Sequence, residues 1–135
     1  MTLDEIRAFF YNDRFATEQG ITIDSAGGGE AVCSVLLRDG HKNADGAIQG
    51  GLIFTLADFA FAVAVNSEGL GTVTLNSSIN FLRRPSGERL IATTNCRQRG
   101  RSTCVYQVDV TDDRGSLVAV MSATGFTRTN EAHLI

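Results

Sequence analysis

The chain has 135 residues, of which 43% are hydrophobic and 20% are charged, and its formal net charge is -3. This size and composition are typical of one globular domain, here expected to span residues 1–135, which can bury a core without disulfides or a structural metal. The acidic balance argues against a general nucleic-acid binder and against a protein that binds membrane surfaces through positive charge.

The cysteines and the apolar segments indicate the compartment. Cys33, Cys96 and Cys104 are an odd number without close spacing, which fits neither a disulfide framework nor a zinc site and favours a reducing environment. The first ten residues carry three charges, unlike a signal peptide. The longest apolar run, residues 52–65, is too short to span a membrane. We therefore expect a cytoplasmic protein without membrane contact.

The predicted elements begin with an amphipathic helix over about residues 2–12, where apolar residues recur at helical spacing. Residues 21–37 alternate apolar and small residues around three glycines, which predicts a hairpin and a strand before a turn at Asp39-Gly40. A helix follows over about residues 49–66. It is apolar nearly all round, so it must be buried on most sides.

The remaining chain is predicted to form strands over Thr72–Leu82, Arg89–Gln98, Ser102–Thr111 and Ser116–Thr127. Short polar turns separate them, at Pro85-Ser86-Gly87, Arg99-Gly100-Arg101 and Asp112-Asp113-Arg114-Gly115. Such turns are typical of antiparallel neighbours, so a meander is expected. The fold class is therefore α+β, an antiparallel sheet with one long helix against a face.

Asp58 is the only ionisable residue in the apolar run 52–65, and its neighbours on the helical surface are themselves apolar. A carboxylate buried without a partner costs several kcal/mol, so this residue needs a partner or a function. One interpretation is structural: Asp58 caps a loop or pairs with an arginine across an interface. The other is catalytic, because carboxylates in dry surroundings serve as bases or nucleophiles.

Gly50 and Gly51 open the same helix, where free backbone N–H groups could stabilise a developing oxyanion. A double glycine can equally be required by a turn. Because Gly50 and Asp58 are eight residues apart, they are separated by ~12 Å along one helix, too far to act on one carbonyl carbon. Two antiparallel copies of the helix would bring Gly50 of one chain opposite Asp58 of the other, which predicts an active site shared within a dimer.

A set of motifs closely resembles the phenylacetate-degradation type of hotdog acyl-CoA thioesterase. They are His41–Gly51, Thr55–Asp58, Asn66–Gly69, Ile79–Pro85 and Gly115–Ala119, and the resemblance covers about residues 38–128 in order. It implies a hotdog fold, an antiparallel sheet wrapped around a long central helix. It also implies a homodimer, usually paired into a homotetramer, that hydrolyses acyl-CoA to a free acid and coenzyme A, with no cofactor or metal.

The resemblance also implies roles for single residues. Asp58 would activate water or attack the thioester directly, and Gly50 would give its N–H to the thioester oxygen. Asn43 would line the site from the same chain as Gly50, and Thr74 would help to orient water. Gln49 and Gly51, beside Gly50, are expected to contact the substrate.

One residue departs from the family pattern, because Gln49 stands where histidine usually precedes the double glycine. Glutamine can donate a hydrogen bond but cannot carry a titrating proton. His41 does not replace it in our interpretation, since a single histidine in a polar loop is more often a surface or turn residue.

Six arginines occur between positions 83 and 101, opposed only by Glu88, and phosphates of coenzyme A are their obvious ligands. Arg83, Arg84 and Arg101 are therefore candidate substrate-binding residues, although solvated arginines on edge strands and turns explain the pattern equally well.

Two other functions compete with thioester hydrolysis. A hotdog enoyl-CoA hydratase or dehydratase would need a histidine base, which the glutamine at position 49 does not supply. A non-catalytic acyl-CoA sensor would keep the ligand and lose turnover, but no DNA-binding segment is evident to give it an output. The acyl group, aromatic or of short or medium chain, stays open.

Overall fold

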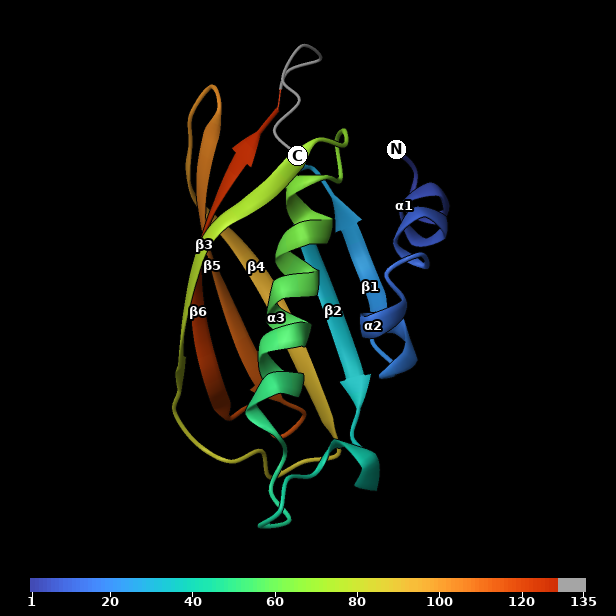
Figure 1. Ribbon diagram of the computed structural model, residues 1–135, viewed down its shortest axis with the longest axis vertical. Helices are drawn as coiled ribbons and strands as arrows, with labels where there is room; N and C mark the ends of the chain where they lie inside the picture. The colour runs from blue at the N-terminus through green and yellow to red at the C-terminus, as the bar shows by residue number, and fades with distance from the viewer. Residues whose placement is uncertain (129–135) are drawn as a thin grey trace.

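A computed structural model describes residues 1–128 as one curved antiparallel sheet that encloses a helix (Figure 1). The sheet order is β1-β2-β4-β5-β6-β3, and the central helix α3 contacts every strand. The strands are β1 (Thr22–Gly27), β2 (Glu30–Leu36), β3 (Thr72–Phe81), β4 (Arg89–Arg99), β5 (Thr103–Asp112) and β6 (Leu117–Thr127). This is the α+β architecture expected from the sequence.

Helix α3 (Gly50–Val65) occupies the predicted central position and forms the middle of the core. Leu56, Ala57 and Phe61 are buried completely, and the Phe61 ring meets the Tyr106 ring edge-on at 5.4 Å. The helix ends where the Asn66 side chain bonds the carbonyl oxygen of Ala62. Since the sheet covers most of its circumference, an almost wholly apolar sequence suits this helix.

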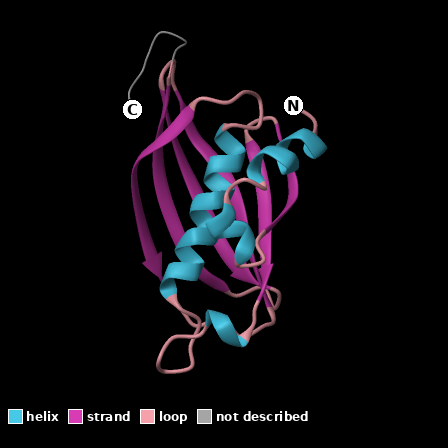
Figure 2. Cartoon of the chain, turned by 45° about the vertical axis from the view of Figure 1, so that its right-hand side comes forward, coloured by secondary structure: helices cyan, strands magenta, loops and turns pink. Residues whose placement is uncertain are grey.

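The amino-terminal helix expected over about residues 2–12 is present as α1, and a second short helix that the sequence analysis did not predict, α2, follows it. Helix α1 (Leu3–Phe10) starts at a capping box formed by Thr2 and Glu5. After a turn, helix α2 (Arg14–Glu18) starts where the Asp13 side chain accepts a hydrogen bond from the N–H of Ala16. Both helices lie on the same side of the sheet as α3 (Figure 2).

The predicted meander is wrong for one connection. The segment containing Pro85-Ser86-Gly87 does not join neighbouring strands, because β3 pairs with β6 at one edge of the sheet whereas β4 lies between β2 and β5. The chain therefore crosses the end of the sheet between residues 82 and 88, beside the start of α3 (Figure 1). The other two predicted turns do join neighbours.

Two further findings concern the cysteines and the length of the helices. All three cysteine thiols are free. Within residues 1–128, no helix is both long and apolar enough to cross a membrane.

Candidate active site

The first turn of α3 presents one free backbone donor. The Gln49 side chain caps the helix by accepting a hydrogen bond from the N–H of Gly51. The N–H of Gly50 has no hydrogen-bond partner among residues 1–128. A Cβ atom at position 51 would lie 2.6 Å from Gln49 Oε1, so a larger residue there would require the Gln49 side chain to shift. The capping role of Gln49 was not foreseen from the sequence, and its Nε2 stays available as a donor.

The loop before α3 is held by Asn43. Its Oδ1 accepts hydrogen bonds from the N–H groups of Asp45 at 2.9 Å and Ala47 at 3.1 Å, and the chain reverses at Gly46, whose φ is 79°. Because both bonds use the side-chain oxygen, the amide nitrogen of Asn43 remains free to donate. The loop thus fixes a second donor near the start of α3.

Gly50, Asn43, Arg83 and Arg84 line one cavity of about 360 Å³ at the crossover segment. Its apolar wall includes Phe81, whose ring lies 3.3 Å from the position that a Cβ atom at Gly50 would take. Four of the residues predicted for the site are therefore gathered at one end of α3.

Asp112 fixes this crossover segment. Its buried carboxylate accepts hydrogen bonds from the N–H and hydroxyl of Ser86, and from the N–H groups of Arg114 and Ser116. These bonds, led by that from the Ser86 N–H, lower the pKa of Asp112 to about 2. Asp112 thereby positions the wall that carries Arg83 and Arg84, a role that its place in a polar turn did not reveal.

Asp58 lies on the half-exposed stripe of α3 that also includes Gly51, Thr55 and Ala62. The described residues offer its carboxylate no hydrogen bond and no ion pair. Burial raises the pKa of Asp58, and the Asp13 carboxylate at the start of α2 raises it further. Without an ion pair inside the protomer, Asp58 retains the properties of an available base.

Thr74 faces the helix side of β3. It is opposite Gly125 of β6, and a Cβ atom at Gly125 would lie 3.1 Å from Phe61 of α3, so side chains at these positions point toward the helix. Thr74 is exposed, and Phe61, which lies beside its cross-strand partner Gly125, belongs to the turn of α3 that follows Asp58.

A second hydroxyl, not identified from the sequence, shares this face of β3. The strand bulges between Thr74 and Asn76, after which Ser77, opposite the buried Ala123, also points toward α3. Within residues 1–128, Ser77 Oγ is the one buried side-chain polar atom without a partner.

The arginines do not form one cluster. Arg101 lies in the β4–β5 turn, at the end of the sheet opposite the crossover segment that contains Arg83 and Arg84 (Figure 1). Closeness in sequence was misleading because β4 runs the whole length of the sheet. Arg101 therefore lies away from the Gly50 cavity of its own protomer.

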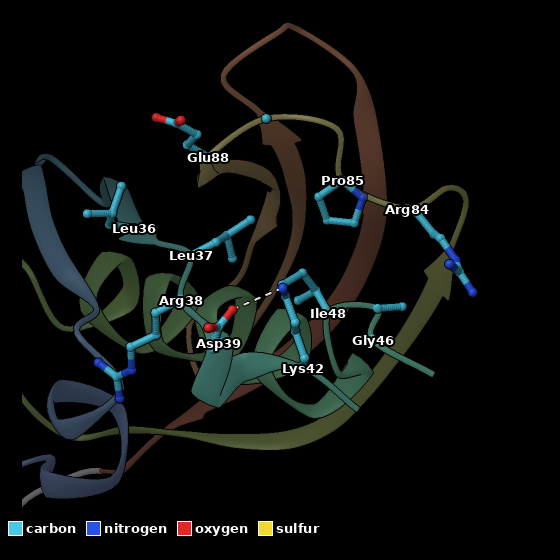
Figure 3. A pocket seen from close by; sticks show the side chains of 12 residues that line it. Leu36, Leu37, Arg38, Asp39, Lys42, Gly46, Ile48, Arg84, Pro85 and Glu88 are labelled. Atoms are coloured by element: carbon cyan, nitrogen blue, oxygen red, sulfur yellow. Dashed lines mark ion pairs between the residues drawn. The ribbon is translucent and has the colours of Figure 1, made fainter. Parts of the chain in front are cut away.

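A larger cavity of about 550 Å³ adjoins the Gly50 cavity and shares Ile48 and Arg84 with it. Figure 3 shows Arg84 at its rim with the guanidinium pointing away, whereas Leu37, Ile48 and Pro85 face inward. Lys42 is paired with Asp39 at 3.0 Å. Arg84 thus lies at the mouth of both cavities, Arg83 lines only the Gly50 cavity, and both are exposed to solvent.

His41 is a structural residue rather than a surface residue. It is buried in the 3-10 helix Asp39–His41, where Nδ1 accepts a hydrogen bond from the Arg38 N–H and Nε2 lies 3.0 Å from the carbonyl oxygen of Gln19. Burial lowers the pKa of His41, so the neutral ring with a proton on Nε2 suits both contacts. His41 ties α2 to the loop that precedes α3.

The continuity of α3 sets the distance between the two catalytic candidates. Gly50 and Asp58 belong to one regular helix of 16 residues, so they are ~12 Å apart along its axis. Within one protomer, Gly50 and Asn43 line one cavity, and Asp58 does not line that cavity. No group of three potential metal-ligating side chains occurs in residues 1–128.

The known proteins that this chain resembles include acyl-coenzyme A thioesterases. The profile of the thioesterase superfamily matches residues 45–119. Acyl-coenzyme A thioesterase PaaI of Escherichia coli K12 is 37% identical over 114 residues, covering 84% of this chain and 81% of the relative. Human acyl-coenzyme A thioesterase 13 is 29% identical, covering 73% of this chain and 74% of the relative.

Solved structures agree with these sequence relatives. The structure of E. coli PaaI, from the phenylacetic acid degradation operon, has a TM-score of 0.85 and 33% identity, covering 90% of this chain and 89% of the other. A hypothetical thioesterase from Streptococcus pneumoniae TIGR4, crystallised with coenzyme A, has a TM-score of 0.80 and 30% identity. The match covers 91% of this chain and 99% of the other.

Proposed function

This chain belongs to the thioesterase superfamily and is a hotdog-fold acyl-CoA thioester hydrolase, and we propose that each of its active sites combines Asp58 of one protomer with Gly50 of a second. The observation that carries the proposal is the arrangement along α3. An available carboxylate and a free backbone donor lie on one helix, ~12 Å apart. The carboxylate and the N–H are each suited to thioester hydrolysis. Because of their separation, the two groups of one protomer cannot act on the same thioester carbonyl.

The edge strand β3 supports pairing of two protomers. β3 ends the sheet, so its outer edge offers unpaired backbone groups to a second copy. Leu75, Phe81 and Leu82 expose apolar side chains at this edge. A twofold axis beside β3 would run the two α3 helices antiparallel and place Asp58 of one opposite Gly50 of the other. By the family resemblance, two such dimers form a homotetramer.

The proposed reaction begins with water held between Asp58 and Thr74. Asp58 takes a proton as the water oxygen attacks the thioester carbon, and the N–H of the partner's Gly50 stabilises the oxyanion that forms. The amide nitrogen of Asn43, from the same chain as Gly50, is a second donor. The C–S bond then breaks, coenzyme A leaves as the thiolate, and the proton on Asp58 is returned to it.

A second route uses the same residues. The Asp58 carboxylate attacks the thioester carbon directly, coenzyme A leaves, and water hydrolyses the resulting anhydride. In both routes Asp58 is essential and Gly50 stabilises the oxyanion. The Asp58 carboxylate must be ionised at the start, so activity should fall at acidic pH.

The substrate is an acyl-CoA whose coenzyme A phosphates meet Arg83 and Arg84 at the mouth of the Gly50 cavity. Both side chains line this cavity and are exposed, so their guanidinium groups can bind phosphate from the solvent side. Arg101 can contribute only from a neighbouring protomer. The three free thiols support a cytoplasmic location.

Release of free thiol from a panel of acetyl-, hexanoyl-, palmitoyl- and phenylacetyl-CoA tests the activity. We expect at least one member to be hydrolysed with many turnovers. Binding of these compounds without thiol release would favour a sensor. Hydration of crotonyl-CoA without thiol release would favour a hydratase, and either outcome would contradict the proposal.

A further inference from the structure

A separate cavity lies on the other side of the α3 amino terminus, between α2 and α3. Its volume is about 370 Å³. Phe15 of α2 and Leu52 and Phe54 of α3 give it apolar walls. Its polar edge includes Gln49, Thr55 and Lys42, whose charge is paired with Asp39. It therefore begins at the residues that flank Gly50, and it differs in chemistry from the arginine-rimmed cavity.

Phe15 is the unusual part of this cavity. Its side chain is 70% exposed, the largest exposure of any large hydrophobic residue in the described chain. The short helix that carries it is nevertheless fixed at both ends. Asp13 caps its start, and the Gln19 carbonyl oxygen, just after its last turn, contacts the buried His41 ring. An aromatic ring is thus held in place beside the catalytic helix without a covering group inside the protomer.

The position of α2 places the Phe15 ring beside the half-exposed stripe of α3. Thr55 lines the cavity, and Asp58 follows it on the same half-exposed stripe of α3. The influence of the Asp13 carboxylate on the pKa of Asp58 also places the start of α2 near this stripe. The cavity consequently lies along the half-exposed stripe of α3 near its Gly50 end, and in the proposed dimer the carboxylate that serves a substrate at this Gly50 comes from the second protomer.

A thioester carbonyl bound at the Gly50 N–H has two arms, coenzyme A on the sulfur side and the acyl group on the carbon side. The cavity toward the crossover segment has arginines at its mouth, and the cavity toward α2 has aromatic walls. Phosphates and apolar groups prefer these two environments respectively. The two arms of the substrate therefore match the two sides of the helix start.

We propose that the cavity between α2 and α3 binds the acyl group of the substrate and that Phe15 is a specificity-determining residue for bulky apolar acyl groups. The inference rests on the proposed function and adds to it the direction in which the substrate lies. Aromatic and medium-chain acyl groups gain contact with the Phe15 ring, whereas an acetyl group is too short to reach it.

The test compares Phe15→Ala with Tyr11→Ala. Tyr11 is a matched control because its side chain is 64% exposed on the same amino-terminal segment, yet it lines a different cavity, on the β1 side. For each variant, kcat/KM is measured with acetyl-CoA and with the best substrate among hexanoyl-, octanoyl- and phenylacetyl-CoA. We expect Phe15→Ala to lower the bulky-to-acetyl ratio about tenfold and Phe15→Leu to restore part of it. Tyr11→Ala should leave the ratio unchanged.

Several results would overturn the inference. The inference fails if Phe15→Ala leaves the bulky-to-acetyl ratio unchanged, or if Tyr11→Ala changes the ratio equally. It also fails if Phe15→Ala changes the molecular mass of the assembly and that change accounts for the lost activity. A parent enzyme that hydrolyses acetyl-CoA but none of the bulky substrates would also overturn it. These failures differ from failure of the proposed function, in which the parent hydrolyses no acyl-CoA at all.

Discussion

Replacing Asp58 by asparagine removes the charge and the basicity of the carboxyl group and leaves its size nearly unchanged. A positioned general base typically contributes about 10²–10⁴-fold to the rate. We therefore expect kcat to fall by about that factor, equivalent to about 3–5 kcal/mol of transition-state stabilisation. KM should change little, because asparagine fills the same space on the α3 stripe.

The same substitution should stabilise the fold at neutral pH. Since burial raises the pKa of Asp58, folding disfavours its charged form. This cost is present at pH values above the raised pKa and absent below the unfolded value of about 3.9. Asp58→Asn should therefore raise Tm by a few degrees at pH 7 and have little effect on Tm below about pH 3.5.

The assay combines thiol release with thermal unfolding, and Asp24→Asn on β1 is the control because Asp24 is exposed. The control should retain the parental kcat and Tm. Parental kcat in Asp58→Asn would refute the catalytic role. A lower Tm at pH 7 would instead show that the carboxylate stabilises the fold, as in the structural interpretation of this residue.

Other substitutions test the remaining parts of the site. Gln49→His should keep or raise kcat, because an imidazole nitrogen can also accept the Gly51 N–H, and complete inactivation would contradict the motif alignment. Arg83→Ala and Arg84→Ala should raise KM more than they lower kcat, and unchanged KM would leave these arginines as solvated surface residues. Asp112→Asn should lower the free energy of unfolding by about 1–3 kcal/mol at pH 7. Because the pKa of Asp112 is about 2 in the folded state, the difference should shrink as pH falls from about 4 toward 2, and a difference independent of pH in urea unfolding would contradict this origin.

Local patterns in the sequence were sufficient to predict the helices and strands but not which strands pair in the sheet. The apolar run before Asn66 predicted α3, and alternating residues predicted the strands. The place of β3 at the sheet edge depends on pairing with β6, whose residues lie 38 (Phe81 and Ala119) to 55 (Thr72 and Thr127) positions later in the chain, and no turn residue encodes this pairing. For that reason the crossover at Pro85 was mistaken for a hairpin turn.

In the candidate site, too, some residues could be predicted from the sequence and others could not. Asp58 was recognisable because a lone carboxylate interrupts an apolar helix, and the separation from Gly50 followed from helix geometry. The hydroxyl of Ser77 and the ring of Phe15 carried no such signal, because their importance depends on burial or exposure beside a distant element. Arg101 shows the opposite error, since residues near in sequence lie at opposite ends of a long strand.

The central claim is that two protomers share each active site, and mixing two inactive variants tests it. Gly50→Pro removes the oxyanion donor at the first helical position, where proline is tolerated, and Asp58→Ala removes the carboxylate. Gly50→Ala keeps the N–H and controls for crowding against Phe81, which lies 3.3 Å from that Cβ position. Each homodimer of the two test variants should be nearly inactive.

In a mixed dimer, the Asp58→Ala chain still offers Gly50 to the intact Asp58 of its partner, so one of the two sites is complete. Random exchange makes about half of the dimers mixed, so activity should recover to about a quarter of the parental value per site. Subunit exchange is followed by native mass spectrometry, and folding of both variants by circular dichroism. Recovery near that value is the result that we predict, and no recovery from folded, fully exchanged subunits would contradict the shared site.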